Sequence, residues 1–337
     1  MIRLFEAINL TDRNSFHVRQ SAERLVEFDT AADVAAIFEQ WNPARWMVLS
    51  GGNNILFTRD YEGLLLTPVS QQIQLLEEQD DEVVVRADAG VEWDDLVAWA
   101  VERDLWGLEN LSLIPGKVGA APVQNIGAYG AEAKDAIRAI HWVDTAEECR
   151  QRVMAVEEAQ FGYRESIFKH ALKGRAIITA VDFALHRTPQ PRIGYGDVER
   201  EVMARGGVSL HNIREAICAI RRFKLPDTTV LGNAGSFFKN PVVERAVAEA
   251  LLAEWPEMPH YATADPERVK LAAGWLIDRT GLKGYRRGAV GVHERQALVL
   301  VNHGGATGEE VIALAEYVIE QVQARFGIRI EPEVNIL

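Results

Sequence analysis

Residues 107–132, GLENLSLIPGKVGAAPVQNIGAYGAE, form a glycine-rich segment that restricts the possible folds more than any other part of the chain. Its glycines and prolines interrupt both the alternation of a strand and the period of a helix. Apolar residues such as Ile114, Val118 and Val123 are too frequent for a solvated linker. Closely spaced glycines also let backbone N–H groups approach a phosphate group. The segment therefore predicts an irregular, partly buried loop that can bind a phosphate or pyrophosphate.

Two standard nucleotide-binding motifs are absent from this glycine-rich segment. It contains neither the dinucleotide fingerprint G-x-G-x-x-G nor the P-loop string G-x-x-x-x-G-K-[ST]. A nucleotide that binds to this segment is therefore held in a different way from the nucleotides of those two motifs.

The first hundred residues predict a mixture of helices and strands. Apolar residues recur at helical spacing over residues 29–41, behind the capping residue Asp29, and again over residues 91–104. Two strands are expected on either side of the tight turn GGNN, and the apolar runs at 62–69 and 81–90 predict two more. Helices and strands do not alternate regularly enough to require a doubly wound parallel sheet. We therefore expect an α+β fold.

The C-terminal part of the chain carries clear helix signals. An aspartate cap followed by proline predicts a helix over residues 265–281. A T-x-x-E capping box and a terminal glycine predict another helix over residues 307–327. Between them, residues 296–302 read as a short strand, and residues 328–337 read as a terminal strand. These elements predict a small α+β domain.

Composition excludes several classes of protein. The 337 residues carry a formal net charge of -13, which argues against a nucleic-acid binder and against a polybasic membrane anchor. The only cysteines, Cys149 and Cys218, are far apart, so neither a disulfide framework nor a zinc site is expected. No signal peptide and no membrane span of about 20 apolar residues is found, and we expect a cytoplasmic protein without a metal.

Six short motifs together carry a resemblance to a known family. They are LSGGNNILF at residues 49–57, the glycine-rich segment, FGYRES at 161–166, KLPD at 224–227, GNAGSFFKNP at 232–241 and EPEV at 331–334. In this order they resemble the UDP-N-acetylenolpyruvoylglucosamine reductases, the flavoproteins of peptidoglycan precursor synthesis. The string GYGD around Tyr195 is similar to the branch of the family that has a tyrosine loop.

The resemblance implies a domain organisation within the α+β class. It predicts a two-subdomain FAD-binding module of the vanillyl-alcohol-oxidase (PCMH) type and a C-terminal α+β substrate-binding domain. The expected boundaries are residues 1–70 and 71–220 for the two FAD-binding subdomains, 221–327 for the substrate-binding domain, and 328–337 for a strand that returns to the active site.

The resemblance also implies a reaction. In the family, hydride passes from NADPH to FAD and then to UDP-N-acetylglucosamine enolpyruvate, which gives UDP-N-acetylmuramate. We expect noncovalent FAD, because none of the eight histidines lies in the glycine-rich segment to act as a covalent anchor. NADPH as co-substrate is the family's preference, and we expect a monomer that binds the nucleotide sugar.

The cofactor-binding residues implied by the resemblance lie in the GGNN turn and the glycine-rich segment. They are Gly51, Gly52, Asn53, Asn54, Ile114, Pro115, Gly116, Gly119, Ala120, Gln124, Asn125, Gly127, Ala128 and Tyr129.

Reduction of an enolpyruvyl ether needs groups that stabilise an enolate-like charge. An arginine fork pairs with the carboxylate, and a carboxylic acid can share the developing charge. Arg164 and Glu333 match the family's residues for these roles, although Glu331 lies on the same face of a strand as Glu333. The family's serine, matched by Ser236, supplies the proton that completes the reduction. From the residues alone, Arg164 reads as a surface arginine on a tyrosine ring, and Ser236 as part of a tight connection.

Further residues match substrate-side positions of the family. They are Tyr163, Tyr195, Lys224, Asn240 and Gln296, and Lys239 is a further candidate to support the serine. A basic run, Arg279, Lys283, Arg286 and Arg287, reads either as a solvated face or as a patch that attracts the diphosphate.

Two alternatives from other classes remain. A flavin-dependent oxidase or dehydrogenase on the same scaffold would often tether its flavin through a histidine. A noncatalytic nucleotide-sugar binder would need the glycines but would have no reason to keep Arg164, Ser236 and Glu333 together.

Overall fold

A computed structural model describes all residues 1–337, and the chain divides into two compact units. The first unit comprises Met1–Ile8, Ala22–Gly51 and Glu62–Arg222. The second unit comprises Asn9–Ser21, Gly52–Tyr61 and Phe223–Leu337. The second unit therefore combines the C-terminal third of the chain with two short segments from its first 61 residues.

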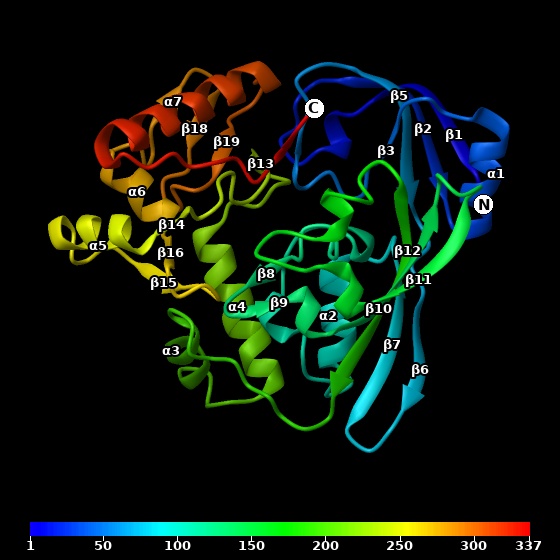
Figure 1. Ribbon diagram of the computed structural model, residues 1–337, viewed down its shortest axis with the longest axis horizontal. Coiled ribbons are helices and arrows are strands. Elements are labelled where there is room, and N and C mark those ends of the chain that lie inside the picture. Colours follow the sequence, from blue (N-terminus) through cyan, green and yellow to red (C-terminus); the bar gives the residue numbers. More distant parts are fainter. The chain divides into compact units, whose positions relative to one another are not determined.

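Two sheets form the framework of the first unit (Figure 1). The four-stranded sheet has the order β1-β2-β5-β3, and the five-stranded sheet has the order β11-β10-β12-β7-β6, with antiparallel neighbours throughout the latter. The strands are β1 (Arg3–Asn9), β2 (Ser21–Phe28), β3 (Trp46–Val48), β5 (Tyr61–Pro68), β6 (Ile73–Glu78), β7 (Glu82–Asp88), β10 (Ile137–Asp144), β11 (Arg150–Ala155) and β12 (Ala176–His186). The helices are α1 (Ala31–Trp41), α2 (Trp93–Val101), α3 (Val198–Met203) and α4 (Leu210–Lys224).

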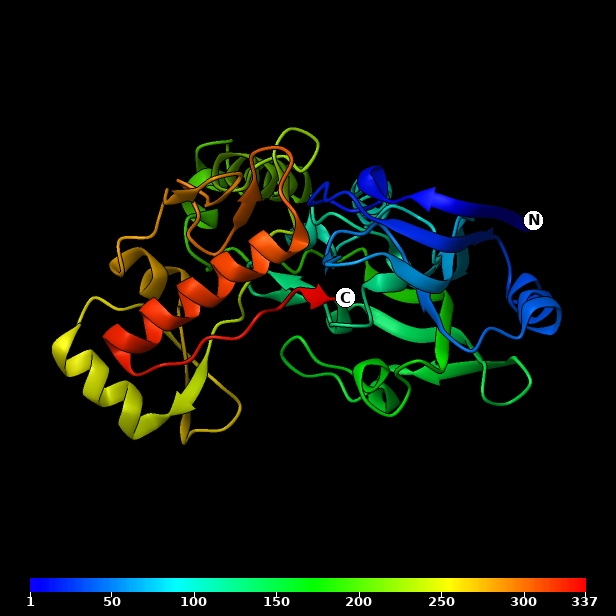
Figure 2. The ribbon, with the colours of Figure 1, turned by 90° about the horizontal axis from the view of Figure 1, so that it is seen from above.

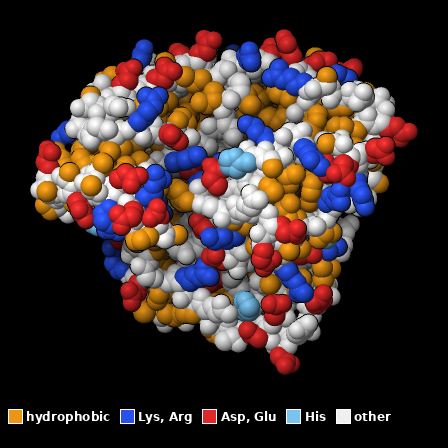
Figure 3. Space-filling model, in the orientation of Figure 1, with side chains coloured by type: hydrophobic (Ala, Val, Ile, Leu, Met, Phe, Trp, Pro, Cys, Tyr) orange, Lys and Arg blue, Asp and Glu red, His pale blue; other side chains and the backbone are white.

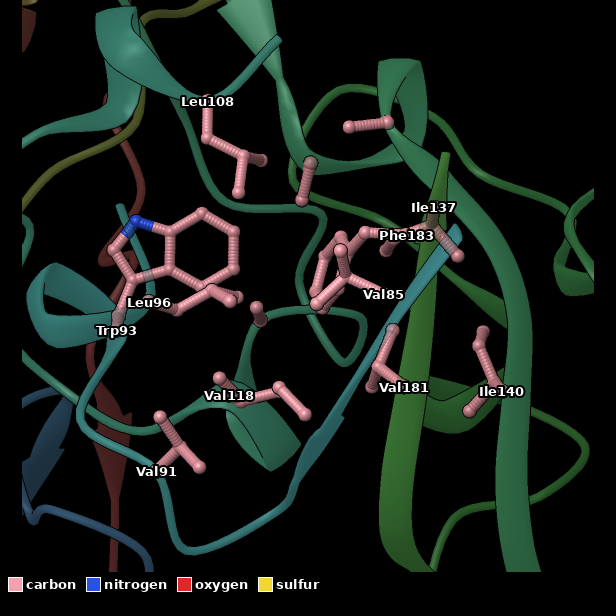
Figure 4. Packing of buried hydrophobic residues seen from close by; sticks show 14 of the residues in the cluster. Val85, Val91, Trp93, Leu96, Leu108, Val118, Ile137, Ile140, Val181 and Phe183 are labelled. Carbon is pink, nitrogen blue, oxygen red and sulfur yellow. The ribbon is translucent and has the colours of Figure 1, made fainter. Parts of the chain in front are cut away.

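The five-stranded sheet is buried on both faces at one end. Val143 and Ile177 pair across β10 and β12 and pack with α1 and the four-stranded sheet. The neighbouring pair, Trp142 and Ile178, points to the opposite face, where the sheet packs against α2 and the glycine-rich segment. Figure 4 shows this second core, in which the ring of Trp93 lies near Phe183. Alternate side chains of the same strands thus build two cores.

The second unit combines short strands with the longest helix of the chain, α7 (Gly308–Phe326; Figure 2). Its strands are β4 (Ile55–Leu56), β13 (Gly232–Asn233), β14 (Val242–Glu244), β15 (His260–Ala262), β16 (Arg268–Leu271), β17 (Arg286–Arg287), β18 (Val290–Val292), β19 (Leu300–Asn302) and β20 (Asn335–Ile336). Its helices are α5 (Arg245–Glu254), α6 (Ala273–Arg279) and α7 (Gly308–Phe326). The strands form sheets of order β13-β19-β18-β17, β14-β16-β15 and β20-β4, and α7 lies against β18 and β19.

Most helices predicted from their capping signals are present. The α1 helix begins behind Thr30, one residue after the expected cap. In its capping box the backbone N–H of Asp33 donates to the Thr30 hydroxyl at 3.1 Å, and the Asp33 carboxylate accepts from the Thr30 N–H at 3.0 Å. The α7 helix has the predicted capping box of Thr307 and Glu310 and ends at Gly327, whose φ is 69°.

The helix predicted over residues 265–281 is wrong in its first half. Residues Arg268–Leu271 form β16, which pairs antiparallel with both β14 and β15. The helix α6 begins only at Ala273. The aspartate and proline signal a helix only locally. In the folded chain the backbone groups of residues 268–271 bond to β14 on one edge and to β15 on the other, and this pairing outweighs the local signal.

Charged side chains of both signs are interspersed over the face in Figure 3. No helix is long and apolar enough to cross a membrane. No group of three or more histidine, cysteine, aspartate and glutamate side chains is placed to hold a metal ion.

A charge cluster joins three strands of the five-stranded sheet. Asp182 accepts hydrogen bonds of 2.6 and 2.9 Å from the Arg86 guanidinium and lies 2.9 Å from Nε2 of His141. Burial alone would raise the pKa of Asp182, but the hydrogen bonds from Arg86 and His141 outweigh it and lower this pKa from 3.8 to about 2. The carboxylate therefore stabilises the fold above pH 4, and this contribution is lost as the pH falls toward 2.

We predict that Asp182→Asn lowers the free energy of unfolding by about 1–2 kcal/mol at pH 7, after allowance for partial solvent screening of the pair. The difference between variant and parent should shrink as the pH falls below about 4, because Asp182 of the unfolded parent then takes up a proton before that of the folded parent does. Urea unfolding at several pH values measures this difference. The exposed Glu199→Gln change is the control. A difference that persists undiminished at pH 2.5 would contradict the prediction.

Candidate active site

The glycine-rich segment is irregular and partly buried, as predicted. It contains two short 3-10 turns, Glu109–Leu111 and Val118–Ala120, and the small hairpin of β8 (Gly127–Ala128) and β9 (Ala131–Glu132). Leu113, Asn125 and Tyr129 adopt left-handed backbone conformations with φ of 59°, 47° and 49°. Such conformations persist in non-glycine residues only where the surroundings fix them.

Close backbone contacts hold this segment against the turn after β7. The N–H of Gly119 donates to the carbonyl of Ala89 at 3.0 Å, and the N–H of Val118 donates to Val91 at 2.9 Å. A Cβ atom on Gly119 would lie 2.6 Å from the Cβ of Ala89. Glycine is therefore required at position 119 because two protein segments approach each other.

Asn125 holds the middle of the segment in shape. Its side chain is fully buried, and Nδ2 donates to Glu132 and to the carbonyl of Gly162, both at 3.0 Å. Its Oδ1 accepts from the N–H of Lys134 at 3.0 Å. The amide group is thus used within the protein, and its contribution to a cofactor site is the shape of the backbone around it.

The GGNN turn contains a second glycine fixed by packing. Gly52 has a φ of 64°, and a Cβ atom there would lie 2.1 Å from the carbonyl oxygen of Arg13. The N–H of Ser15 donates to the carbonyl of Gly52 at 3.1 Å. Sequence reasoning missed Ser50, which precedes the turn and whose buried hydroxyl has no hydrogen-bond partner in the chain. Only its place beside the glycine pair could have drawn attention to it.

Arg164 lies against the glycine-rich segment of the first unit. Its backbone is left-handed with a φ of 58°, and its guanidinium donates to the carbonyl of Gly127 at 2.7 Å and to that of Asn125 at 3.5 Å. The guanidinium carbon is 5.4 Å from the centre of the Tyr163 ring. These contacts bring two of the predicted site residues, Arg164 and Tyr163, to the predicted cofactor segment.

Ser236 and Glu333 belong to neighbouring backbone segments of the second unit. The N–H of Glu333 donates to the carbonyl of Phe237 at 2.7 Å, and the N–H of Lys239 donates to Glu331 at 2.9 Å. Phe237 and Phe238, which follow the serine, are almost completely buried. The two phenylalanines therefore anchor the segment, and the half-exposed Ser236 precedes this anchor.

Asn54 ties the GGNN turn to the segment that carries Glu333. Its Nδ2 donates to the carbonyl of Glu333 at 3.3 Å, and its own carbonyl accepts from the N–H of Asn335 at 3.1 Å. Beyond this point β20 pairs in parallel with β4. Glu333 is thus held on both sides by backbone pairing. It is half-buried, whereas Glu331 is exposed.

The other predicted substrate-side residues of the second unit have structural partners. Oδ1 of Asn240 accepts from the N–H of Ala273 at the start of α6 at 2.9 Å, which leaves its NH2 group as the donor. Gln296 bonds locally within its own turn, where Oε1 accepts from Leu298 at 3.4 Å. Lys224 is the last residue of α4. These contacts fix the Asn240 and Gln296 side chains before any ligand binds.

The basic run at residues 279–287 is partly neutralised. Arg279 pairs with Glu257 at 3.2 Å, and Lys283 pairs with Asp278 at 3.2 Å. Arg286 and Arg287 form β17 and are exposed. Only this second pair retains the character of a basic patch.

Tyr195 docks on the glycine-rich segment within the first unit. Tyr195 is 43% exposed, and its ring meets Tyr129 edge to face, with ring centroids 6.1 Å apart.

Burial raises the pKa of Tyr129, and it lowers the pKa of Arg221, whose guanidinium bonds the Tyr129 hydroxyl. Sequence reasoning did not single out Arg221 or the buried Glu109, whose pKa is raised by burial although Gly107 donates to it.

The residues present fit a dinucleotide cofactor. The unpartnered buried hydroxyl of Ser50 can donate to a phosphate oxygen, and the backbone N–H groups of Gly51 and Gly52 follow it directly in the sequence. The structure brings Arg164, Tyr163 and Tyr195 to the glycine-rich segment in the first unit. It brings Asn54, Ser236 and Glu333 together in the second unit.

Two family models match the chain. One, described as UDP-N-acetylenolpyruvoylglucosamine reductase, C-terminal domain, matches residues 226–337. The other, described as FAD binding domain, matches residues 22–150. The matched ranges contain the Ser236 and Glu333 segments on one side and the glycine-rich segment on the other.

Known structures show the same fold. The structure of the reductase from Thermus caldophilus covers 100% of this chain and 98% of its own, with a TM-score of 0.68 and 24% identity. A solvent-stable cholesterol oxidase covers 98% of this chain and 87% of its own, with a TM-score of 0.51 and 11% identity. The expected α+β fold, a PCMH-type FAD-binding module with a C-terminal domain, is confirmed.

Curated relatives cover almost the whole chain. A UDP-N-acetylenolpyruvoylglucosamine reductase of Chromobacterium violaceum is 48% identical over 336 residues, 98% of each chain. Relatives of the same name from Pseudomonas aeruginosa and Bacteroides fragilis are 46% and 45% identical, over 99% and 98% of each chain. At this identity and coverage, the chain belongs to the UDP-N-acetylenolpyruvoylglucosamine reductase family.

Proposed function

We propose that this chain is the FAD-dependent oxidoreductase that reduces UDP-N-acetylglucosamine enolpyruvate to UDP-N-acetylmuramate in peptidoglycan precursor synthesis, with NADPH as the hydride source. One observation supports the assignment of residues most directly. Backbone pairing of residues 237–239 with residues 331–333 sets Ser236 and Glu333 on adjacent segments. A noncatalytic nucleotide-sugar binder would not need this arrangement.

The FAD is held noncovalently by the GGNN turn and the glycine-rich segment. Ser50 and the backbone N–H groups of these segments bind the pyrophosphate, since a buried hydroxyl and glycine N–H groups are suited to phosphate oxygens. When bound, FAD would supply the hydride-transfer chemistry that links NADPH to the sugar substrate. The chain's own residues bind, orient and protonate that substrate.

Arg164 and Glu333 stabilise the charge that hydride delivery creates. Hydride arrives at the methylene carbon of the enolpyruvyl group, and the electron pair of the double bond moves to the adjacent carbon and its carboxylate. The fork of Arg164 pairs with this carboxylate, while Glu333 shares the developing charge as a carboxylic acid. The Arg164 guanidinium donates hydrogen bonds to the carbonyls of Gly127 and Asn125, which hold it in a fixed orientation.

Ser236 donates the proton that completes the reduction. Its hydroxyl O–H bond breaks as the new C–H bond forms at the carbon next to the carboxylate. Because a hydroxyl is a weak acid, Lys224, Lys239 and Asn240 stabilise the alkoxide that remains. Asn240 is suited to this role because its oxygen already accepts from the first turn of α6, which leaves the NH2 group as the donor.

Tyr163, Tyr195, Lys224, Asn240 and Gln296 bind the nucleotide sugar, with Tyr195 closing over it. Residues 1–70 and 71–220 serve as the two FAD-binding subdomains, and residues 221–327 serve as the substrate-binding domain. Residues 328–337 form no continuous strand, since β20 covers only Asn335–Ile336, but this C-terminal segment brings Glu333 to the site. The enzyme acts as a monomer in the cytoplasm, without nucleic acid or membrane partners.

Noncovalent attachment predicts that acid denaturation releases the flavin. The glycine-rich segment contains neither histidine nor cysteine, so it offers no covalent anchor for the isoalloxazine ring. The yellow colour should move to the supernatant after centrifugation, as measured by flavin absorbance. Flavin that stays with the precipitated protein would exclude noncovalent binding.

The Arg164→Lys variant should lose turnover by roughly 10²–10³-fold, because a lysine ammonium cannot reproduce the planar fork on the enolate carboxylate. Steady-state kinetics of the flavin-loaded variant measure this loss. Arg175→Lys is a matched control, because Arg175 makes a bidentate pair with Asp144 away from the proposed site. Near-normal turnover of a folded Arg164→Lys protein would reduce Arg164 to a packing role.

The Ser236→Ala variant should be impaired in one half-reaction only. Flavin reduction by NADPH needs no proton from this serine, whereas reoxidation by the enolpyruvyl sugar leaves a carbanion that must be protonated. The colour should bleach at the normal rate and then return slowly, as followed by stopped-flow absorbance. Ser209→Ala, at the start of α4, is the control. If Ser236→Ala slows both half-reactions equally, or neither, the serine is structural.

A further inference from the structure

Asn110 links the glycine-rich segment to the loop that carries Tyr195. Its side chain is 2% exposed, and Nδ2 donates two hydrogen bonds of 2.7 Å each. One acceptor is the carbonyl of Tyr129, near the end of the glycine-rich segment, and the other is the carbonyl of Arg192. Oδ1 of Asn110 is buried and accepts no hydrogen bond from the chain. The hydrogen bonds of the Asn110 side chain are therefore both donated by Nδ2.

Contacts on both sides of Tyr195 hold its loop in place, and the Arg192 side bonds this amide. The side chain of Arg192 pairs with Asp135, and Ile193 packs, as Tyr129 does, against the buried core of α3 and α4. On the other side of Tyr195, the N–H of Val198 donates to the carbonyl of Tyr195 at 3.2 Å as α3 begins. Tyr195 therefore lies in a short loop between residue 192 and α3. Its ring contacts that of Tyr129, with the two ring centroids 6.1 Å apart.

The backbone of Tyr129 is itself in a strained conformation. Its φ is 49°, and the following Gly130 has a φ of 81°. A non-glycine residue stays in this region only when its surroundings hold it there. The side-chain amide of Asn110 donates to the carbonyl of Tyr129, whose ring contacts Tyr195, and to the carbonyl of Arg192, three residues before Tyr195. One amide thus fixes the backbone on both sides of the Tyr129–Tyr195 contact.

We propose that Asn110 is a positioning residue that sets the place of Tyr195 for the nucleotide-sugar substrate. The two hydrogen bonds from Asn110 Nδ2 to the carbonyls of Tyr129 and Arg192 form a clamp, which holds the start of the Tyr195 loop at a constant distance from Tyr129. This inference rests on the proposed function in one respect, namely that Tyr195 closes over the substrate. The residue touches neither reacting atom and acts only through the loop.

The first test removes the clamp and measures how often the loop opens. In the flavin-loaded Asn110→Ala enzyme, chymotrypsin should cut the Tyr195–Gly196 bond about 5- to 30-fold faster than in the parent. This range corresponds to the loss of two neutral hydrogen bonds. Mass spectrometry of the fragments identifies the bond that is cut. An unchanged rate at this bond would overturn the proposal.

The second test asks whether the loosened loop binds substrate less well. The KM for the enolpyruvyl sugar should rise by a similar factor, whereas flavin reduction at saturating NADPH should stay at the parent rate. Faster cleavage with an unchanged KM would overturn the positioning role and leave a purely structural clamp.

A matched control is available in the same unit. Asn212 also holds two carbonyls through Nδ2, those of Arg205 and Gly207, at 3.1 and 2.8 Å. Asn212→Ala should change neither the cleavage of the Tyr195–Gly196 bond nor the KM. If Asn212→Ala raises both to the same extent, the effect of Asn110→Ala is one of general loosening and the proposal is wrong.

Two further variants separate this proposal from the proposed function. Tyr195→Ala tests the role of Tyr195 by itself: if its KM is unchanged, the substrate role of Tyr195 fails, whatever the cleavage assay shows for Asn110. Should Asn110→Ala not fold, Asn110→Ser keeps one donor and should give an intermediate cleavage rate. Parent-like cleavage in a folded Asn110→Ser protein would contradict the clamp.

Discussion

The burial of both faces of the five-stranded sheet supports the rest of the first unit. One face packs on α1 and the four-stranded sheet, and the other receives Trp93 and the glycine-rich segment. The indole N–H of Trp93 donates to the carbonyl of Leu111 at 2.9 Å, so the helix α2 also fixes the start of that segment. The internal backbone hydrogen bonds of this segment are short-range turns, such as those of Ala121 to Val118 and Ile126 to Ala121, which do not fix its place in the unit. A rigid sheet beneath it fixes that place through packing.

In the second unit, backbone pairing between residues 237–239 and residues 331–333 fixes the proposed site residues, as packing on the five-stranded sheet fixes the glycine-rich segment in the first unit. Ser236 precedes the buried pair Phe237 and Phe238, whose rings pack edge to face with centroids 5.1 Å apart. Glu333 is fixed through its N–H and its carbonyl, by Phe237 and Asn54. The backbone at Ser236 is anchored by its buried neighbours in the chain. Substitutions of Ser236 can therefore change the chemistry while the fold is retained.

The sequence allowed the helices with strong caps to be predicted, because a capping box is a local interaction. Thr307 and Glu310 bond each other's backbone within one turn, and nothing distant is needed to recognise them. The same reasoning failed for residues 268–271, because β14 and β15 pair with them from elsewhere in the chain. Local signals could not reveal those partners.

The site shows the same division between local and distant information. The glycine-rich segment could be recognised from its composition, and the family motifs pointed to Arg164, Ser236 and Glu333. Ser50 and Asn110 could not be found in this way. Their importance lies in an unpartnered buried hydroxyl and in two distant carbonyls, and neither feature leaves a pattern in the sequence.

Carbonyl groups explain why polar side chains are buried around the glycine-rich segment. A segment without a helical or strand ladder leaves its carbonyls to be satisfied by side-chain donors. Asn110 donates to Tyr129, and Arg164 donates to Gly127. Asn125 extends the same pattern from within the segment by donating outward to Gly162. A buried asparagine in such a loop therefore has a structural role before any ligand binds. Arg164 has a structural and a catalytic role under the proposed mechanism, because the hydrogen bonds that it donates to the carbonyls of Gly127 and Asn125 also orient its guanidinium.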